Sequence, residues 1–298
     1  SQIVSITQNL ISIENITSEG GADLTVYDTS GVNVITTNTG NDTIHSKGGN
    51  DTITTGSGND TVYLGDGTYT VDLGAGNDKV YLTTTASSID GNTGTDEAIV
   101  RAFDGFVDVY IDLQFSTYFV PSKLSAQDGM EVSLQNFETV TIDGNVAATL
   151  LGTAAADTLT GDAGADTITG RGGADTLTGG SRSDKFVFES GDTGITEATA
   201  DTITDFATGT DKIDVDAPGT YVEADGTSTA DFAAFITAAN ASLTTTSDDI
   251  YAQYNFKGEG NTLVVVDENK SGTVDAGDTL IILTGLSTAD GLDSSDFI

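Results

Sequence analysis

The chain has 298 residues, with 46 acidic against 10 basic side chains and a formal net charge of −36. So acidic a surface repels nucleic acid and anionic lipid, so neither is expected as a partner. The sequence contains no cysteine, which excludes disulfides, thiolate nucleophiles and cysteine-bound zinc. Such a composition suits a bacterial exterior or the cytosol of a halophile, and composition alone does not separate the two.

The first thirty residues, 1–30, are predicted to form strands that lead into more regular sequence. They lack the basic region and the long apolar stretch of a signal peptide. No apolar run anywhere in the chain reaches the roughly 18 residues that a membrane-spanning helix needs, so no membrane insertion is expected. Because the sequence begins at Ser1 without a methionine, we expect a fragment or a processed product.

Residues 31–100 contain a nine-residue period in which three residue types stay in phase. Aspartate occupies five of the grid positions, at Asp42, Asp51, Asp60, Asp78 and Asp96. Two positions earlier the residue is usually glycine, at Gly40, Gly49, Gly58, Gly67, Gly76 and Gly94. Two positions later it is small or aliphatic, at Ile44, Ile53, Val62, Val71, Val80, Ile89 and Ala98. A disordered acidic tract has no reason to keep this phase, so a folded repeat is predicted.

Each residue type has a physical role in such a repeat. Glycine permits positive φ at a turn and lets backbone carbonyls converge on one point. Aspartate supplies a carboxylate at the same place, and the aliphatic residue begins a short strand and points inward. Nine residues then form one turn and one strand, and eighteen form a full coil. Stacked coils of this kind predict a parallel β-roll.

The segments "GGNDTITTG", "GSGNDTVYL" and "GAGNDKVYL" resemble the RTX nonapeptide repeat, G-G-x-G-x-D-x-U-x. The resemblance implies an all-β fold, a calcium-bound parallel β-roll, in which several Ca²⁺ ions lie between turns one coil apart. It also implies that aspartate carboxylates and backbone carbonyls hold these ions. The expected ligands in this block are Asp42, Asp51, Asp60, Asp78 and Asp96, together with the turn residues Gly40, Gly56, Gly58, Gly74, Gly76 and Gly94.

The phase of the repeat predicts that the two edges of this first roll differ. Positions eighteen apart stack on one edge, so Asp42, Asp60, Asp78 and Asp96 form an unbroken column with room for about three ions under the family geometry. The opposite edge carries Asn33, Asp51, Tyr69 and Ser87. It is expected to bind calcium weakly, or not at all beyond Asp51.

The grid breaks over residues 101–147, which are predicted to be inserted strands packed beside or between two rolls. It returns over residues 148–190, which are predicted to form a second RTX β-roll. The aspartates there are Asp157, Asp166, Asp175 and Asp184, and the following inward residues are Leu159, Ile168, Leu177 and Phe186. Ala155 and Arg182 replace two of the expected glycines, and a roll this small needs neighbours to cap its ends.

Residues 191–298 are predicted to form a β-rich C-terminal cap with one helix. Asp201, Asp205 and Asp211 either bind a further ion or cap turns, and the sequence favours neither alternative. The segment "STADFAAFITAANASL" predicts the helix, with Ser228 or Thr229 as its N-cap. We expect this helix to cover the open end of the roll.

A second type of calcium site is predicted near the end of the chain. The residues Asp267, Asn269, Ser271, Thr273, Asp275 and Asp278 occupy positions 1, 3, 5, 7, 9 and 12 of an EF-hand-like loop, with Gly272 at position 6. The loop departs from that pattern in two ways, because position 12 is the shorter aspartate and because strands rather than helices flank it. The alternative interpretation is an acidic hairpin loop.

The functional prediction follows from these repeats and from what the chain lacks. His45 is the only histidine and is expected to be a solvated surface residue, so no zinc-protease motif or Ser-His-Asp triad is possible and no enzyme activity is expected. The end "DGLDSSDFI" resembles the signal of proteins exported by type I secretion. We expect a calcium-dependent folding and assembly module of an extracellular structural protein, similar to the C-terminal regions of bacterial surface-layer proteins, which self-associates at the cell surface. The alternatives are the secretion and folding domain of a secreted protease or lipase, and a segment of a large RTX adhesin.

Overall fold

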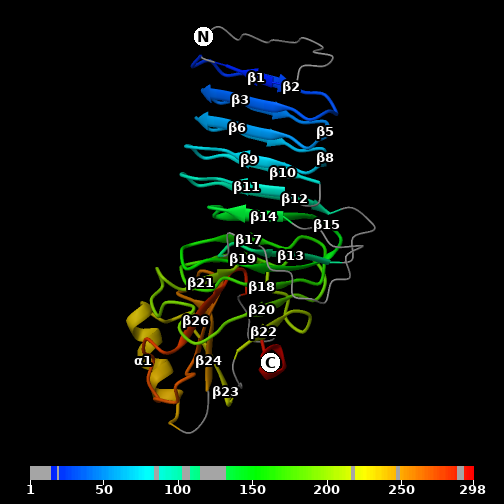
Figure 1. Ribbon diagram of the computed structural model, residues 1–298. Helices are drawn as coiled ribbons and strands as arrows, with labels where there is room; N and C mark the ends of the chain where they lie inside the picture. Colours follow the sequence, from blue (N-terminus) through cyan, green and yellow to red (C-terminus); the bar gives the residue numbers. More distant parts are fainter. Residues whose placement is uncertain are drawn as a thin grey trace. The chain divides into compact units, whose positions relative to one another are not determined.

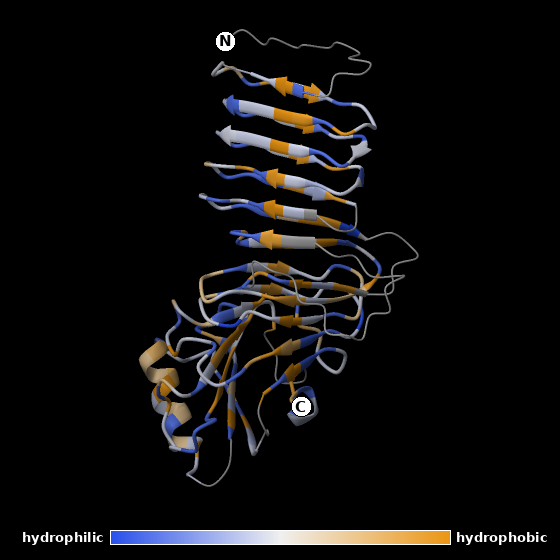
Figure 2. Cartoon of the chain, viewed as in Figure 1, coloured by the Kyte–Doolittle hydropathy of each residue, from blue (hydrophilic) through white to orange (hydrophobic). Residues whose placement is uncertain are grey.

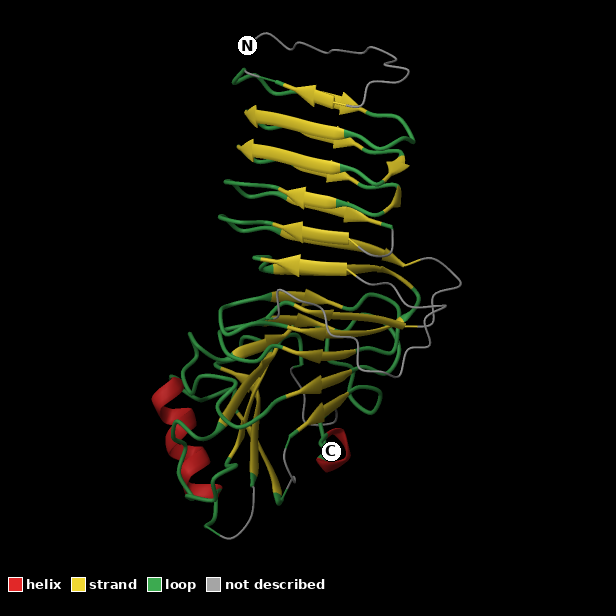
Figure 3. Ribbon diagram, viewed as in Figure 1, coloured by secondary structure: helices red, strands yellow, loops and turns green. Residues whose placement is uncertain are grey.

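The computed structural model describes residues 15–18, 20–83, 87–102, 108–114, 132–215, 219–245, 249–286 and 292–298. The chain divides into two compact units, Ser1–Val146 and Ala147–Ile298. Both are built mainly from short parallel strands, and Figure 3 shows how strand dominates over helix in the described part of the chain. The predicted all-β fold with a parallel β-roll is confirmed.

The first unit contains two parallel sheets whose strands alternate along the chain. One sheet has the order β1 (Asn15–Thr17), β3 (Val34–Thr39), β6 (Thr52–Ser57), β9 (Thr70–Asp72), β11 (Ser87–Asp90) and β14 (Val132–Gln135). The other contains β2 (Thr25–Tyr27), β4 (Thr43–His45), β7 (Thr61–Tyr63), β10 (Lys79–Leu82), β12 (Glu97–Ala102) and β15 (Thr139–Gly144). A short pair, β5 (Gly48–Gly49) with β8 (Asp66–Gly67), lies at one turn, and β13 (Asp108–Asp112) also belongs to this unit. Figure 1 shows the strands of successive coils stacked one on another.

The register of these strands follows the eighteen-residue coil that the sequence predicts. Ile44 pairs with Val62, and Val62 pairs with Val80, so each inward residue stacks on its equivalent in the next coil. All seven predicted inward residues of this unit are buried. Figure 2 shows the same alternation as apolar positions recurring on each strand. Burying each such aliphatic side chain contributes about 1.5–3 kcal/mol, which offsets part of the entropy lost on folding.

The strands after the break in the grid continue the two sheets of the first unit. β14 pairs in parallel with β11, and β15 pairs in parallel with β12. The amide of Asp96 donates to Glu138 Oε2 at 2.8 Å, so a glutamate takes the place that the next grid aspartate would have. Residues 101–147 were expected to be inserted strands. Two of the strands found there, over 132–144, lie in register with the repeat. The intervening residues 115–131 lie outside the described part of the chain.

The second unit also contains strands of two sheets, one parallel and the other mixed. One has the order β16 (Ala147–Leu151), β18 (Thr167–Thr169), β20 (Lys185–Val187) and β22 (Lys212–Asp214). The other begins with β17 (Thr158–Thr160), β19 (Thr176–Thr178) and β21 (Asp201–Ile203) and continues through β26 (Thr279–Leu283), β25 (Asn261–Val266), β24 (Ile250–Phe256) and β23 (Tyr221–Asp225). The inward residues Leu159, Ile168, Leu177 and Phe186 are buried as predicted. β26 pairs in parallel with β21, the last strand of the coils in this sheet, and antiparallel with β25. The antiparallel strands therefore continue the sheet of the roll.

The helix α1 (Phe232–Ser242) begins later than the sequence predicts. Its N-cap is Asp231, whose side chain accepts from the Ala234 amide, and neither Ser228 nor Thr229 has this role. Its buried residues, Phe235 and Ala239, belong to the apolar cluster of β24–β26. The predicted position across the open end of the roll is wrong, because the apolar face of the helix packs on these antiparallel strands. In Figure 1 it lies beside β24.

Candidate metal centres

Four aspartates of the first unit form a continuous column in which each side chain reaches back to the coil before it. The Oδ1 atom of Asp60 accepts from the Asp42 amide at 2.7 Å, and Oδ1 of Asp78 accepts from the Asp60 amide at 2.7 Å. Asp96 repeats the contact to the Asp78 amide at 2.8 Å, and Asp42 accepts from Leu24 at 2.8 Å. The predicted column of carboxylates on one edge is therefore present in the fold.

The second carboxylate oxygen of each column aspartate is buried without a hydrogen-bond partner. This holds for Oδ2 of Asp42, Asp60, Asp78 and Asp96, and the four residues are no more than 2% exposed. A buried charged oxygen that lacks a partner costs several kcal/mol unless a proton or a cation compensates it. The column thus presents a row of hard oxygen atoms that the protein itself leaves uncompensated.

The turn glycines of this edge bring backbone carbonyls to the same column. Gly58, Gly76 and Gly94 have φ of +131°, +141° and +148°, a region that side chains with a Cβ rarely adopt. A Cβ added to Gly76 would collide with the carbonyl oxygen of Gly58, and one added to Gly94 would collide with that of Gly76. Gly40, Gly56 and Gly74 show the same positive φ and the same close approach to a carbonyl eighteen residues earlier. Glycine is therefore required for the coils to stack closely enough to align these carbonyls.

These residues suit a hard divalent cation. Carboxylate and carbonyl oxygens are the ligands that Ca²⁺ prefers, and the column contains no nitrogen or sulfur donor. Within the described residues, no three acidic or histidine side chains converge as a metal cluster. An ion at this edge would therefore depend on backbone carbonyls as well as on the buried Oδ2 atoms.

The opposite edge of the first unit is built differently. Asp51 Oδ1 accepts from the Asn33 amide at 2.8 Å, and its Oδ2 accepts from the Ser46 hydroxyl at 2.7 Å. Tyr69, which takes the next grid position, is 1% exposed and fills the interior with its ring. Both oxygens of Asp51 thus have protein partners, in contrast to the aspartates of the column.

The second unit has two shorter columns. Ala148, Asp166 and Asp184 donate their amides to the Oδ1 atoms of Asp166, Asp184 and Asp211, in that order. The other column runs from Asp157 through Asp175 to Asp201, with amide to Oδ1 distances of 2.8 and 2.9 Å. The Oδ2 atoms of Asp166, Asp175, Asp184 and Asp201 are buried and have no hydrogen-bond partner.

Two residues of these columns lie outside the nine-residue grid. Asp201 and Asp211 stand 26 and 27 residues after the aspartates whose amides they accept. The sequence left open whether they cap turns or bind an ion. Both accept from amides of the preceding coil, and ion binding at these two residues stays a prediction. A local signal was available, because "ADTITD" at 200–205 nearly repeats "ADTITG" at 165–170. Asp205 also caps a turn, accepting from the amides of Gly179 and Gly180 at 3.0 and 2.7 Å.

Glycine keeps space open beside the carboxylates in the second unit too. A Cβ added to Gly161 would collide with Oδ2 of Asp166, and one added to Gly170 would collide with Oδ2 of Asp175. Gly179 stands in the same relation to Asp184. Any larger residue at these positions would fill the space next to the unpartnered oxygen, which is the space that a bound cation requires.

The predicted EF-hand-like loop connects the antiparallel strands β25 and β26. Its first residue, Asp267, is fully buried and accepts from the amides of Ser271 and Gly272 at 3.0 and 2.7 Å. Its last residue, Asp278, is also fully buried, and Oδ1 of this residue has no hydrogen-bond partner. Burial, followed by the charges of Asp267 and Asp275, raises the pKa of Asp278 to about 6.

The remaining predicted ligands of the loop are tied to one another. Asn269 donates to Asp275 Oδ1 at 2.7 Å and accepts from the Ser271 amide at 2.8 Å. The Ser271 hydroxyl donates to the Thr273 carbonyl at 2.7 Å. Gly272 has a φ of +73°, as the sharp turn at position 6 requires. The loop is closed by its own hydrogen bonds, and the Oδ1 atom of Asp278 is a buried oxygen that they leave unused.

Burial shifts the titration of the column carboxyls toward neutral pH. Burial, with the charges of column neighbours adding to it, raises the pKa of Asp78, Asp166 and Asp175 to about 7 and that of Asp201 to about 8. An unperturbed aspartate has a pKa of about 4. The metal-free folded chain therefore binds more protons than the unfolded chain between these values. The stabilisation of the metal-free fold by protonated carboxyls is complete below about pH 4, and it is lost as pH rises through about 7 to 8.

This linkage predicts the direction of a pH effect. Protein stripped of metal on a chelating resin is expected to melt at a higher temperature at pH 5 than at pH 8, because protonation neutralises the buried carboxyls. Thermal melts followed by far-UV circular dichroism at the two pH values measure this. A metal-free protein that is more stable at pH 8 would contradict it.

The single histidine lies in a stack of aromatic rings on one sheet. The ring of His45 is sandwiched between those of Tyr27 and Tyr63, with centroids 4.6 Å away on each side. Tyr81 extends the stack at 4.5 Å from Tyr63. His45 was expected to be a solvated surface residue, but it is half-buried here, and its main contacts are aromatic.

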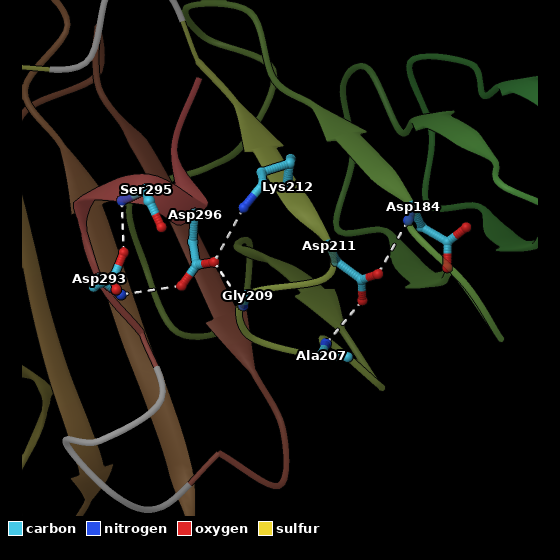
Figure 4. A network of polar contacts seen from close by, with 8 residues as sticks. All are labelled: Asp184, Ala207, Gly209, Asp211, Lys212, Asp293, Ser295 and Asp296. Atoms are coloured by element: carbon cyan, nitrogen blue, oxygen red, sulfur yellow. Dashed lines mark hydrogen bonds and ion pairs between the residues drawn. The ribbon is translucent and has the colours of Figure 1, made fainter.

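The last residues of the chain pack against β22. Phe297 forms a bridge with Ile213, and the Ile298 carbonyl accepts from the Val215 amide at 3.1 Å. The buried carboxylate of Asp296 accepts from the Gly209 amide at 2.8 Å and lies 3.4 Å from Lys212 Nζ. Figure 4 shows this network beside the cap of Asp184 by Asp211.

Asp296 is therefore expected to stabilise the C-terminal cap. Asp296→Ala would leave the Gly209 amide and the Lys212 ammonium without their partner, a loss of about 2–4 kcal/mol in the free energy of unfolding of this unit. Urea unfolding at fixed calcium concentration measures the loss. The matched control is Asp293→Ala, which removes an exposed carboxylate of the same 3-10 turn, η1 (Ser294–Asp296). Equal losses in the two variants would show that the buried contacts of Asp296 are not the cause.

Comparison with known proteins agrees with this geometry. Four stretches of the chain match the family model of the RTX calcium-binding nonapeptide repeat, at residues 27–62, 36–71, 46–80 and 151–185. No curated protein matches the chain. The matched stretches contain the aspartate column of the first unit up to Asp78 and the four grid aspartates of the second. No helix among the described residues is long and apolar enough to cross a membrane.

Proposed function

We propose that this chain, which is built on RTX calcium-binding nonapeptide repeats, is the calcium-dependent folding and assembly module of an extracellular structural protein exported by type I secretion. RTX repeats bind several calcium ions per repeat block, and they are typical of modules in proteins secreted by that route. The repeat is a structural, calcium-binding element and is not catalytic by itself. The protein that carries this module has a structural role and lies in a surface layer or elsewhere on the cell surface.

The observation that carries the proposal is the row of buried, unpartnered Oδ2 atoms in the aspartate columns. Each of them, together with neighbouring turn carbonyls, supplies the oxygen donors of a calcium site. Because the donors meet only when the coils stack, binding free energy becomes folding free energy. Extracellular calcium sites work at about 10⁻⁴–10⁻³ M, far above cytosolic levels, so the chain is expected to fold after export.

The proposed ligand set follows the predicted positions. In the first unit the ions lie between Asp42, Asp60, Asp78 and Asp96, with Gly40, Gly56, Gly58, Gly74, Gly76 and Gly94 shaping the turns. In the second unit they lie along Asp157, Asp166, Asp175 and Asp184. The buried Oδ1 atom of Asp278 supports one further ion in the loop that begins at Asp267.

Assembly is tested with the whole chain in calcium. The purified protein, folded in millimolar CaCl₂, is applied to a lipid or carbon support and imaged by negative-stain electron microscopy. Ordered two-dimensional arrays that dissolve on chelation and do not form in MgCl₂ support a surface-layer role. Folded protein that stays monomeric at every calcium concentration contradicts self-assembly and favours the alternative role as the export module of a larger secreted protein.

A further inference from the structure

The first coil buries a carboxylate that the repeat does not require. Asp28 is 5% exposed, and it follows Tyr27, which pairs with His45. Asp28 therefore stacks beside Ser46, at an inward position that Leu64 occupies two coils after Asp28. Its Oδ1 atom accepts from the Lys47 amide at 2.7 Å, whereas its Oδ2 atom is buried and accepts no hydrogen bond.

A second buried carboxylate and two hydroxyls lie next to it. Ser46 donates to Asp51 Oδ2 at 2.7 Å, and the Ser46 oxygen lies 3.3 Å from the Tyr69 hydroxyl. The four residues Asp28, Ser46, Asp51 and Tyr69 are at most 6% exposed. They come from three successive coils and gather oxygen atoms alone.

The charges of this cluster reach one another, and no basic side chain compensates them. Burial, followed by the charges of Asp51 and Asp28, raises the pKa of Tyr69, and burial with the charge of Asp51 also raises that of Asp28. The ion pairs within the described part of the chain involve Lys79, Arg101, Lys185, Lys212 and Lys257, and none includes Asp28 or Asp51. Two adjacent buried carboxylates without a cationic partner are strongly unfavourable.

We propose that Asp28, Ser46, Asp51 and Tyr69 form a separate calcium site inside the first coils of the roll. Its donors are side-chain oxygens between the two edges of the first coils, in contrast to the turn carbonyls and the carboxylates of the column at one edge. A divalent cation neutralises both carboxylates, whereas a single shared proton would leave one buried negative charge. The exclusively hard oxygen donors favour Ca²⁺ over transition metals.

With this site, the edge that carries Asp51 gains a calcium-binding position. The nonapeptide pattern places only Asp51 there, so by itself this edge is a weak binding position. Asp28 lies five residues before the grid position of Asn33 and supplies the missing charge from the interior. The inference goes beyond the proposed function, because it adds an ion that does not belong to the repeat columns.

Native mass spectrometry of the full chain in calcium acetate tests the site by counting bound ions. Asp28→Asn keeps an Oδ1 atom for the Lys47 amide but removes the charge, and it is expected to bind one calcium ion fewer than the unmodified chain. Asp72→Asn is the matched control, because Asp72 is exposed on β9 and its charge is not among those that act on Asp28 or Tyr69, and it is expected to bind the same number as the unmodified chain. An unchanged count in folded Asp28→Asn, with the other ions present, overturns the site. A chain that binds no calcium at all contradicts the proposed function instead.

A second measurement keeps the inference testable if Asp28→Asn does not fold. Terbium bound in calcium sites emits when nearby tyrosines are excited, and the chain contains no tryptophan. Tyr69→Phe keeps the ring but removes the hydroxyl, so it is expected to lose part of the tyrosine-sensitised emission and to weaken one binding step. The control is Tyr221→Phe, which removes a half-buried tyrosine of the other unit. Equal emission from both variants overturns the proposed site.

Discussion

Removal of calcium is expected to abolish most of the parallel β-structure of both units. Without the ion, the columns hold at least eight buried Oδ2 atoms that have no hydrogen-bond partner, namely those of Asp42, Asp60, Asp78, Asp96, Asp166, Asp175, Asp184 and Asp201. At pH 8 their mutual repulsion and desolvation exceed the marginal stability of a domain, which is about 5–15 kcal/mol. Far-UV circular dichroism across an EDTA titration and its reversal with CaCl₂ measures the transition. A metal-free protein already rich in β-structure at pH 8 would contradict it.

Two controls separate calcium binding from simple charge screening. MgCl₂ at the same concentration is expected to restore little structure, because Mg²⁺ demands octahedral geometry and keeps its water. Asp78→Asn retains an oxygen for the Asp60 amide but removes one buried charge. It is expected to be more structured than the unmodified chain without calcium and to need a higher calcium concentration for complete folding. Asp72→Asn, an exposed change on β9, is expected to leave both properties unchanged.

Gly76→Ala is expected to destabilise the first unit by about 3 kcal/mol or more, even in saturating calcium. Two costs add, because a φ of +141° strains any residue with a Cβ by about 1–3 kcal/mol and because the new methyl group would collide with the Gly58 carbonyl. Relief of the collision separates two coils and moves the carbonyls away from the column. Urea unfolding and calcium titration of the same variant measure both consequences.

Gly209→Ala is the control that isolates backbone strain from stacking. Gly209 has a φ of +71°, and a Cβ added there would meet nothing within 4 Å. It is expected to lose only about 1 kcal/mol, the usual cost of a left-handed alanine. Equal losses for Gly76→Ala and Gly209→Ala would show that stacking against the Gly58 carbonyl contributes nothing to stability.

The sequence was sufficient to predict the coil and its inward residues, because the period is strict where the coils stack. Ile44, Val62 and Val80 stand eighteen residues apart and pair in the predicted register. The difference between the two edges was also predictable, since Tyr69 interrupts the aspartates on one of them. Phase alone carries this information and needs no knowledge of side-chain contacts.

The features that the sequence did not predict depend on contacts between residues at irregular spacing. Glu138 takes the place of a grid aspartate 42 residues after Asp96, and Asp201 does so 26 residues after Asp175. Inserted residues between coils remove the nine-residue period from the sequence, but the hydrogen bond from the amide of one coil to the carboxylate of the next is kept. The N-cap of α1 was misplaced because Ser228, Thr229 and Asp231 all suit the role, and only packing of Phe235 determines where the helix begins.

The aspartate column also has a direction. The Oδ1 atom of each column aspartate accepts from the amide of the aspartate in the preceding coil. The hydrogen bonds of the column therefore all run in one direction along the chain. A single terminating residue, such as Glu138 or Asp211, is then enough to end the series. Duplication or deletion of a whole eighteen-residue coil within the column leaves the amide-to-carboxylate contacts of the remaining coils intact. Such a fold can gain or lose whole coils in evolution while the same terminating residue still ends the column.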